Sequence, residues 1–382
     1  MSRRPSVWTA GVLAGALACA GHRPPPQVPV PELRPEDVAV SLYLIGDAGK
    51  PDSAGDPVLL ALRRDLATHR SQRVVVFLGD NAYPRGLPAP GRPGRREAEQ
   101  HLAAQLEVVT SSGASGYFVP GNHDWAKHGR EGWEAIRRQA AFVDSVSGGK
   151  VLLRPHGGCP GPSVVDIGSR LRLVLLDTQW WLHAGPKPRD PDSDCGADAE
   201  PEIVDSIRAA LTGGSGRLVV LAEHHPLRSG GSHGAHFDWK DHIFPLRLIK
   251  PWLWVPLPLI GSLYPAARQQ GISSQDIPSR PYQRLIAAFR RAFVPAPPAL
   301  YAAGHEHNLQ VLTGGSARLE LVSGAGIYGH TGEAAPIRGT LFARRASGFA
   351  RLDVPRVGRA RLAVLEVDAE GGSREVFSTG VE

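Results

Sequence analysis

Six residues with side chains that commonly bind metal ions follow predicted strands. They are two aspartates, an asparagine and three histidines: Asp47, Asp80, Asn122, His224, His305 and His307. Carboxylates suit hard divalent and trivalent cations, and imidazole suits borderline ones. Each residue alone has an ordinary explanation, because an aspartate after a glycine is usually a turn residue. Their joint occurrence at the ends of different strands predicts a metal centre.

The elements that must position these residues alternate along the chain. Apolar runs predict strands at 38–45, 73–78, 117–119, 171–176, 218–221 and 299–303. Segments with helical periodicity lie at 58–67, 97–109, 133–143, 201–211 and 282–293, and the tail from residue 309 is β sequence punctuated by glycines. Continuous apolar strands are typical of a sheet covered on both faces, and the alternation indicates an α/β layered domain. Sites in such sheets lie beyond the carboxyl ends of the strands.

Five short motifs, in their order along the chain, resemble those of the calcineurin-like metallophosphoesterases. Within that family the sequence is most similar to the purple acid phosphatases of the small tartrate-resistant type. The motifs are Asp47-x-Gly49, Gly79-Asp80-x-x-Tyr83, Gly121-Asn122-His123-Asp124, His224-x-Pro226 and Gly304-His305-x-His307. The resemblance covers roughly residues 38–323 and is weaker between the motifs.

This resemblance implies a fold and a role for each matching residue. The fold would be a four-layer α/β/β/α sandwich of two mixed sheets flanked by helices, formed by residues 38–382. Asp80 would bridge two metal ions. Asp47, Tyr83 and His307 would complete one metal site, and Asn122, His224 and His305 the other. His123 would contact the substrate, and Asp124 would orient the His123 ring.

The residue types favour a mixed-valence metal pair. Most of the wider family has a histidine two residues after the first aspartate, whereas this chain has Gly49 there and offers Tyr83 instead. A phenolate in place of a neutral ligand suits Fe(III) beside a divalent ion, which would be Fe, Zn or Mn. A trivalent ion also lowers the pKa of bound water, which provides a nucleophile at acidic pH. The alternative is that Tyr83 is an ordinary core or rim aromatic residue.

The implied activity is hydrolysis of a small phosphomonoester by metal-bound hydroxide, with His123 assisting the leaving group. A phosphodiesterase or nucleotide pyrophosphatase would use the same site. An envelope lipoprotein that only binds a ligand is the alternative outside the enzyme class, and the presence of all seven ligands disfavours it. His225 stands where the small type usually has an aromatic residue, so it is either an extra proton donor or a packed side chain.

Composition and charge are those of a globular protein without a nucleic-acid motif. Hydrophobic residues make up 42% of the 382 residues, and the formal net charge is +6. The excess arginines are spread along the chain, and no dense basic block is interleaved with aromatic residues. The sequence therefore predicts no nucleic-acid partner, and it says nothing about the oligomeric state.

The N-terminus predicts export to the periplasm or cell envelope. Residues 1–20 have the layout of a signal peptide, and residues 21–37 form a proline-rich tether. The sequence Ala16-Leu17-Ala18-Cys19 fits a relaxed lipobox, so lipidated Cys19 would attach the protein to a membrane. The competing interpretation is cleavage after Ala18-Cys19-Ala20, which would release a soluble protein. The tether that follows favours the lipobox.

Two further features lie outside the motifs. Cys159 and Cys195 form an even pair in loop sequence, which predicts a disulfide in an oxidising compartment; two unpaired thiols are the alternative. Residues 229–276 form an insert with an apolar run around Trp252 that prolines prevent from forming a helix. We expect this insert to form a lid over the site rather than a membrane-surface patch, the other explanation of its apolar surface.

Overall fold

A computed structural model describes residues 30–51, 55–189, 193–214, 216–248 and 252–382. The predicted signal peptide, Cys19 and residues 21–29 of the predicted tether lie outside the described residues. Residues 30–37, the rest of that tether, lie against the domain. The backbone carbonyl of Val30 accepts a hydrogen bond from Arg361 Nε at 2.9 Å, and its N–H donates to Ser378 Oγ at 3.2 Å. The contacts of the folded domain therefore begin before residue 38.

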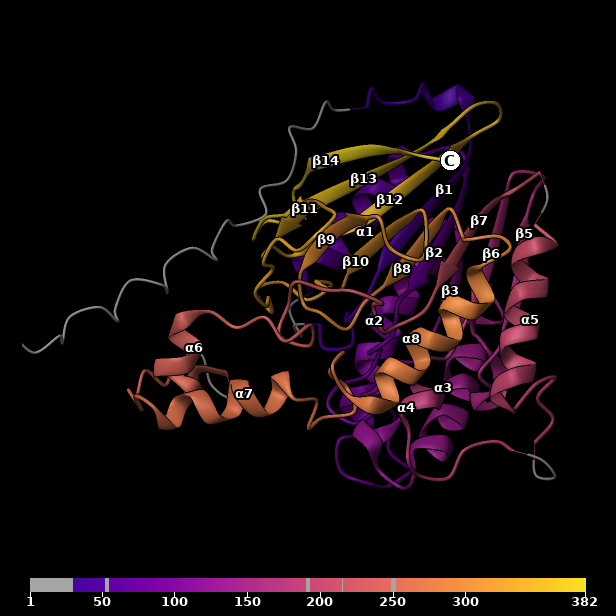
Figure 1. The fold of residues 1–382 in the computed structure, drawn as a ribbon. Coiled ribbons are helices and arrows are strands. Elements are labelled where there is room, and N and C mark those ends of the chain that lie inside the picture. Colours follow the sequence, from indigo (N-terminus) through magenta and orange to yellow (C-terminus); the bar gives the residue numbers. More distant parts are fainter. Residues whose placement is uncertain (1–29, 52–54, 190–192, 215, 249–251) are drawn as a thin grey trace, which may run out of the picture.

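The first of two seven-stranded sheets has the strand order β14-β13-β12-β1-β2-β3-β4 (Figure 1). Strands β1 to β4 run parallel, and β12, β13 and β14 continue the sheet antiparallel beyond β1. The bounds are β1 Val38–Ile45, β2 Gln72–Phe77, β3 Ser115–Phe118, β4 Val151–Leu153, β12 Gly348–Pro355, β13 Ala360–Val367 and β14 Ser373–Val381.

The second sheet has the order β11-β9-β10-β8-β7-β6-β5. Strands β6, β7, β8 and β10 are parallel, while β5, β9 and β11 pair antiparallel. Their bounds are β5 Ser163–Ile167, β6 Leu171–Leu175, β7 Leu218–Ala222, β8 Leu300–Ala303, β9 Leu309–Thr313, β10 Leu319–Ser323 and β11 Thr340–Arg344. Both sheets are therefore mixed, as predicted.

Helices cover the outer face of each sheet. Three helices pack on the first sheet: α1 Pro57–Thr68, α2 Arg95–Ser112 and α3 Gly132–Ser147. Three pack on the second: α4 Gln179–Leu182, α5 Glu200–Thr212 and α8 Arg280–Phe293. The remaining α-helices, α6 Trp239–Ile243 and α7 Leu263–Gln269, belong to the insert and stand apart from the sheets (Figure 1). Among the described residues, no helix is both long and apolar enough to cross a membrane.

The alternation of side chains along β1 explains how the layers pack. Leu42 and Leu44 point into the core between the two sheets, whereas Tyr43 and Ile45 point into the core beneath α1, α2 and α3. All four side chains are fully buried. Because successive residues of a strand face opposite sides, a strand buried on both faces must be apolar throughout. Two mixed sheets between helices follow, and the expected layered α/β architecture is confirmed at this level.

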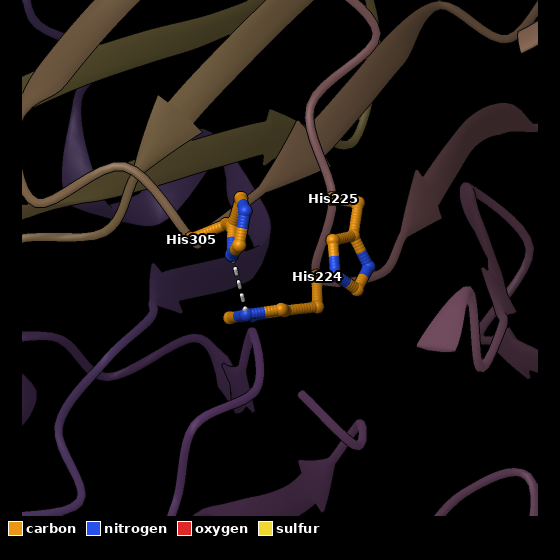
Figure 2. Close-up of side chains that lie close together, drawn as sticks. All are labelled: His224, His225 and His305. Carbon is orange, nitrogen blue, oxygen red and sulfur yellow. Dashed lines mark hydrogen bonds between the residues drawn. The ribbon is translucent and has the colours of Figure 1, made fainter. Parts of the chain in front are cut away.

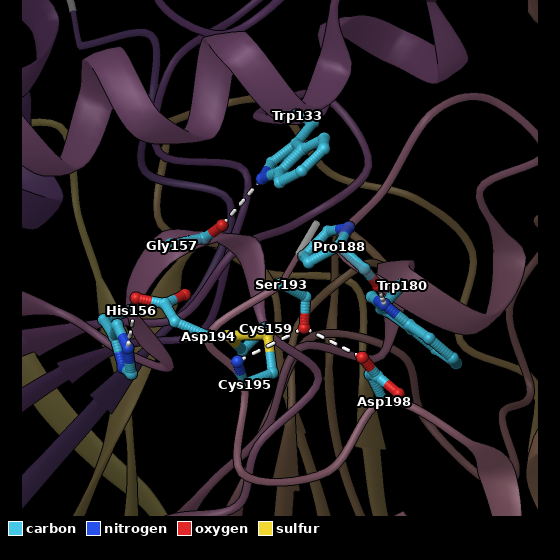
Figure 3. Close-up of a disulfide and its surroundings, with 10 residues drawn as sticks. All are labelled: Trp133, His156, Gly157, Cys159, Trp180, Pro188, Ser193, Asp194, Cys195 and Asp198. Atoms are coloured by element: carbon cyan, nitrogen blue, oxygen red, sulfur yellow. Dashed lines mark hydrogen bonds and ion pairs between the residues drawn. A yellow bond between two sulfur atoms is a disulfide. The ribbon is translucent and has the colours of Figure 1, made fainter. Parts of the chain in front are cut away.

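A disulfide between Cys159 and Cys195 links two loops near the second sheet (Figure 3). The predicted pairing is therefore present, with the two Cα atoms 5.5 Å apart. The neighbouring Trp133 Nε1 donates to the carbonyl of Gly157 at 2.7 Å. The disulfide joins the segment before β5 to the segment before α5, and its two cysteines are 36 residues apart in the chain.

Candidate metal centre

The predicted ligands lie together where strands of both sheets end. Asp47 follows β1 and Asp80 follows β2, while His224 follows β7 and His305 follows β8. The backbone N–H of Gly46, after β1, donates to the carbonyl of Ser323, at the end of β10, at 2.7 Å. Strand ends of the two sheets therefore meet here. Asp47, Asp80 and His305 have positive φ angles of 58°, 55° and 69°, which is uncommon for residues other than glycine. Backbone conformations of this kind cluster at functional sites.

One group of donor atoms comes from Asn122, His224 and His305. Asn122 Oδ1 lies 3.1 Å from His224 Nε2 and 3.1 Å from His305 Nδ1. The two histidine nitrogens lie 3.2 Å apart (Figure 2). Ligands that bind one metal ion at roughly 2.0–2.1 Å lie about 3 Å from one another. The spacing of these three atoms therefore fits a single ion.

Backbone carbonyls determine which nitrogen of each ring faces this group. His224 Nδ1 lies 2.8 Å from the carbonyl oxygen of Leu78, and His305 Nε2 lies 3.0 Å from that of Gln275. A carbonyl only accepts hydrogen bonds, so these nitrogens carry the hydrogen and the opposite nitrogens carry lone pairs. Three lone pairs thus converge without a hydrogen between them. A bound cation would remove the repulsion, and a carbonyl behind each ring is the usual support of a histidine ligand.

A second group of donor atoms comes from Asp47, Tyr83 and His307. Tyr83 Oη donates to Asp47 Oδ1 at 3.0 Å and lies 3.3 Å from His307 Nε2. His307 Nε2 lies 3.4 Å from Asp47 Oδ1. The other carboxylate oxygen of Asp47 accepts the backbone N–H of His305 at 2.8 Å, which ties this group to the first one. The predicted partners of Tyr83 are therefore its actual neighbours.

Asp80 lies between the two groups, as the resemblance implies. Its Oδ1 atom is 3.5 Å from His224 Nε2, and it accepts the backbone N–H of His123 at 2.8 Å. Asp47, Asp80 and His224 each place one donor atom within 4.8 Å of the other two. A carboxylate in this position can offer one oxygen to each of two ions.

Burial and mutual repulsion shift the pKa values of these groups. Burial raises the pKa of Asp47 to about 8, with a contribution from the negative charge of Asp80. Burial alone would also raise the pKa of Asp80, but His224 and His123 lower it to about 2. Burial lowers the pKa of His307 to about 4 and that of His305 well below its usual value. The imidazoles of His305 and His307 are therefore neutral near pH 7, which is the form that binds metal ions.

The electrostatics and the donor set together fit a pair of metal ions. Burial and the charges of Asp47 and Asp80 raise the pKa of Tyr83 well above its usual value. Such a phenol stays protonated unless a strong positive charge lies beside it. A hard cation between Tyr83 and the two carboxylates would supply that charge. The donors of Asn122, His224 and His305 suit a divalent ion beside it.

His123 lies at the solvent side of the site. Its Nδ1 atom is 2.7 Å from the backbone carbonyl of Pro84, so this nitrogen carries the hydrogen. The free Nε2 atom is 3.9 Å from Asp80 Oδ2, and 18% of the side chain is exposed. The ring packs against Tyr83 in a tilted arrangement, with a centroid distance of 4.4 Å. A solvent molecule or substrate can therefore reach this nitrogen.

Asp124 supports the backbone of the site and does not orient the His123 ring, the role that the resemblance implies. Asp124 accepts backbone N–H groups from Gly121 at 2.8 Å, Asn81 at 3.0 Å and Ala82 at 3.1 Å. These bonds hold the loop after β2 against the loop after β3. The His123 ring is oriented by Pro84, because its backbone carbonyl occupies the Nδ1 position.

His225 is a packed side chain rather than a further proton donor. Its Nδ1 atom lies 2.7 Å from Thr178 Oγ1, and its Nε2 atom lies 2.9 Å from Gln275 Oε1. Burial lowers its pKa well below the usual value. Both ring nitrogens are thus used by buried protein groups, even though the ring lies beside His224 and His305 (Figure 2).

Sequence reasoning missed His233, which lies against the first group of donors. Its ring centroid is 4.0 Å from that of His305, and its Nδ1 atom is 2.9 Å from Asp276 Oδ1. Arg268 Nε donates to the same carboxylate at 2.6 Å and holds it in place. The available signal was a histidine within the glycine- and serine-rich start of the insert, nine residues after His224.

His330 is a second residue that sequence reasoning missed. Its ring centroid is 4.2 Å from that of His307 and 6.3 Å from that of Tyr83. It also lines a cavity of about 980 Å³ together with Lys50 and His101. This cavity therefore begins beside the second group of donors. No motif in the sequence marks His330.

Comparisons with known proteins inform the fold only. No protein-family model matches the sequence, and no curated protein matches it. Among solved structures, the fold is similar to that of GAP50, the anchor in the inner membrane complex of Plasmodium. The TM-score is 0.55 at 12% sequence identity, and the match covers 90% of this chain and 88% of that chain. At such identity the likeness extends to the arrangement of the sheets and helices, and it says nothing about chemistry.

Proposed function

We propose that this protein is a dinuclear metal-dependent phosphatase that hydrolyses phosphomonoesters, in the manner of the purple acid phosphatases. One observation carries the proposal: six donor side chains form two groups of three, with Asp80 between them. The resemblance assigned the same residues to two metal ions. A scaffold that kept only the fold would have no reason to bury two carboxylates beside lone-pair nitrogens.

Seven residues of the chain would bind the two metal ions of such a reaction. Asp47, Tyr83 and His307 would hold a ferric ion, Asn122, His224 and His305 would hold a divalent ion of Fe, Zn or Mn, and Asp80 would contribute to both sites. When bound, the metal pair supplies positive charge for the phosphate and lowers the pKa of water.

Two histidines outside the donor groups, His123 and His233, would act on the substrate. His123 keeps its hydrogen on Nδ1 for Pro84, so Nε2 is the nitrogen available to a leaving-group oxygen. A protonated Nε2 there gives its proton to that oxygen as the bond to phosphorus breaks. His233, held by Asp276, packs against His305 and would contact a phosphate oxygen.

Metal removal tests the proposal directly. The purified protein should contain two metal ions per chain and hydrolyse p-nitrophenyl phosphate. Dialysis against a chelator should abolish hydrolysis, and Fe together with Zn or Mn should restore it. Faster hydrolysis of bis(p-nitrophenyl) phosphate than of the monoester would instead identify a phosphodiesterase.

A non-catalytic protein is the second candidate, and one observation favours it. The similar solved structure is named as an anchor in a membrane complex rather than as an enzyme. A protein that binds two metal ions but hydrolyses neither phosphate ester would support this candidate and exclude the first.

The ferric assignment of Tyr83 has a spectroscopic test. A phenolate bound to Fe(III) gives a broad visible absorption band, so the native protein should be coloured. Tyr83→Phe removes only the oxygen near Asp47 and His307 and should abolish the band. Tyr43→Phe is the matched control, because Tyr43 is a buried tyrosine whose Oη bonds Asp65 instead. A colourless, active protein that contains only zinc or manganese would contradict the ferric assignment and leave hydrolysis standing.

A further inference from the structure

The insert ends in a projection, here called the arm, that consists of residues 236–248 and 252–272. Figure 1 shows α6 and α7 of the arm set apart from both sheets. Within the arm, α6 packs against α7 and against two short 3-10 helices, Pro245–Leu248 and Ile260–Ser262. The N–H of Leu257 donates to the carbonyl of Ile243 at 2.7 Å, which closes the arm on itself.

Large apolar side chains are concentrated on the surface of the arm. Of the fifteen exposed large hydrophobic residues in the described chain, nine belong to it: Trp239, Trp252, Trp254, Val255, Leu259, Ile260, Leu263, Tyr264 and Ile272. Leu259 is 90% exposed, Ile260 66% and Leu263 67%. Side chains exposed to this extent cover no neighbouring surface, so they do not form the expected lid in this structure. A patch of this kind marks an interaction surface.

The charge of the arm shows what kind of surface it fits. Basic side chains lie beside two exposed tryptophans of the arm, and Lys240 Nζ is 5.9 Å from the ring centroid of Trp239. The guanidinium of Arg247 lies 4.2 Å from the ring centroid of Trp254. The two acidic residues of the arm, Asp238 and Asp241, hydrogen-bond each other's backbone in the capping box of α6. Arg268 is paired with Asp276, so Lys240 and Arg247 supply the positive charge beside the apolar side chains, which complements an anionic surface.

A lipid surface matches this combination better than a protein groove does. Tryptophan and tyrosine prefer the boundary between lipid and water, aliphatic side chains enter the acyl region, and basic residues bind anionic headgroups. Pro256 and Pro258 leave backbone groups of the arm without helical partners, and such backbone cannot enter the hydrocarbon core. The chemistry therefore limits the arm to the depth of the headgroups.

We propose that the arm docks this protein on an anionic lipid surface. Leu259, Ile260 and Leu263 enter the boundary between headgroups and acyl chains, and Arg247 contacts lipid phosphates. The stem of the arm reaches the metal centre, because the N–H of Ile277 donates to the carbonyl of His233 at 2.8 Å. Docking consequently holds the metal centre close to the lipid. The inference does not depend on phosphatase activity.

Vesicle flotation of the full chain tests the proposal. Native protein should float with vesicles that contain phosphatidylglycerol and bind vesicles of pure phosphatidylcholine less. Replacing Leu259, Ile260 and Leu263 together with serine should weaken binding at least about tenfold, because each side chain loses its apolar burial. Arg247→Gln should weaken binding to the anionic vesicles about fivefold and leave binding to the neutral ones unchanged.

The matched control replaces three exposed valines elsewhere, Val146, Val294 and Val357, with serine. It should bind vesicles like the native protein. Both triple variants share the native N-terminus, so a lipid or signal segment there contributes equally to every measurement. Hydrolysis of p-nitrophenyl phosphate should be the same in all of them, which separates failure of docking from failure of the proposed function.

Three outcomes would overturn the proposal. The first is equal flotation of the native protein and the arm triple variant. The second is an arm variant that changes only the selectivity among large phosphate esters, which would make the arm a lid. The third is a dimer in solution that the same three substitutions dissociate, which would make the arm an interface between copies of this chain.

Discussion

Asp80→Asn should remove metal ions from both sites and reduce hydrolysis of p-nitrophenyl phosphate to background. Asp80 Oδ1 lies 3.5 Å from His224 Nε2 in the first group of donors. The Asp80 carboxylate is also one of the neighbours that raise the pKa of Tyr83 in the second group. An amide has one acceptor oxygen and no charge, so it cannot serve two cations. Loss of a residue behind a ligand typically lowers metal affinity by about 10- to 100-fold, and loss of a shared ligand should exceed that.

Metal analysis after gel filtration would measure this effect, with circular dichroism to confirm that the variant is folded. Asp144→Asn is the matched control, because Asp144 is an exposed aspartate at the end of α3. It should retain two metal ions. An Asp80→Asn protein that keeps both ions and its activity would show that Asp80 does not bridge them.

His123→Ala should lower kcat on p-nitrophenyl phosphate by about 100- to 10,000-fold, the usual contribution of a positioned proton donor. Both metal ions should stay, because His123 Nε2 belongs to neither donor group. The leaving group matters here: an alkyl alcohol has a higher pKa than p-nitrophenol and needs more protonation, so the loss should be larger still for alkyl phosphates.

His156→Ala is a suitable control, since His156 is exposed and lies near the disulfide (Figure 3). It should leave kcat unchanged. Loss of metal ions together with the His123 side chain would identify it as a ligand and refute the assigned role.

Most of the elements that carry the candidate ligands were predictable from local sequence. The predicted strands 38–45, 171–176 and 218–221 correspond to β1, β6 and β7 within one residue at each end. A continuous apolar run predicts a strand that is buried on both faces, without knowledge of the strands that pair with it. The glycine-flanked aspartates and histidines follow them directly, so their position at the strand ends was also a local property. The identity of the ligand-type residues was therefore readable from the sequence.

The order of the strands and the short elements required the folded chain. Strands β12, β13 and β14 extend the first sheet from the far end of the sequence, and β12 pairs with β1 across about 310 residues. Strand β4 and helix α4 are three and four residues long, too short for a periodic pattern to reveal them. Strand β5 is an edge strand, exposed in part, and lacks the continuous apolar run of β6 and β7.

The supporting contacts of the site were decided only by the tertiary structure. Leu78 and Gln275 select the ring nitrogens of His224 and His305 through their backbone carbonyls, which carry no side-chain signature. Pro84 orients His123 in the same way. His233 reaches His305 because the stem of the insert folds back to the site. The candidate ligands are specified by side-chain type, which a sequence displays. Their orientation depends on backbone groups that every residue has, and only packing places those groups.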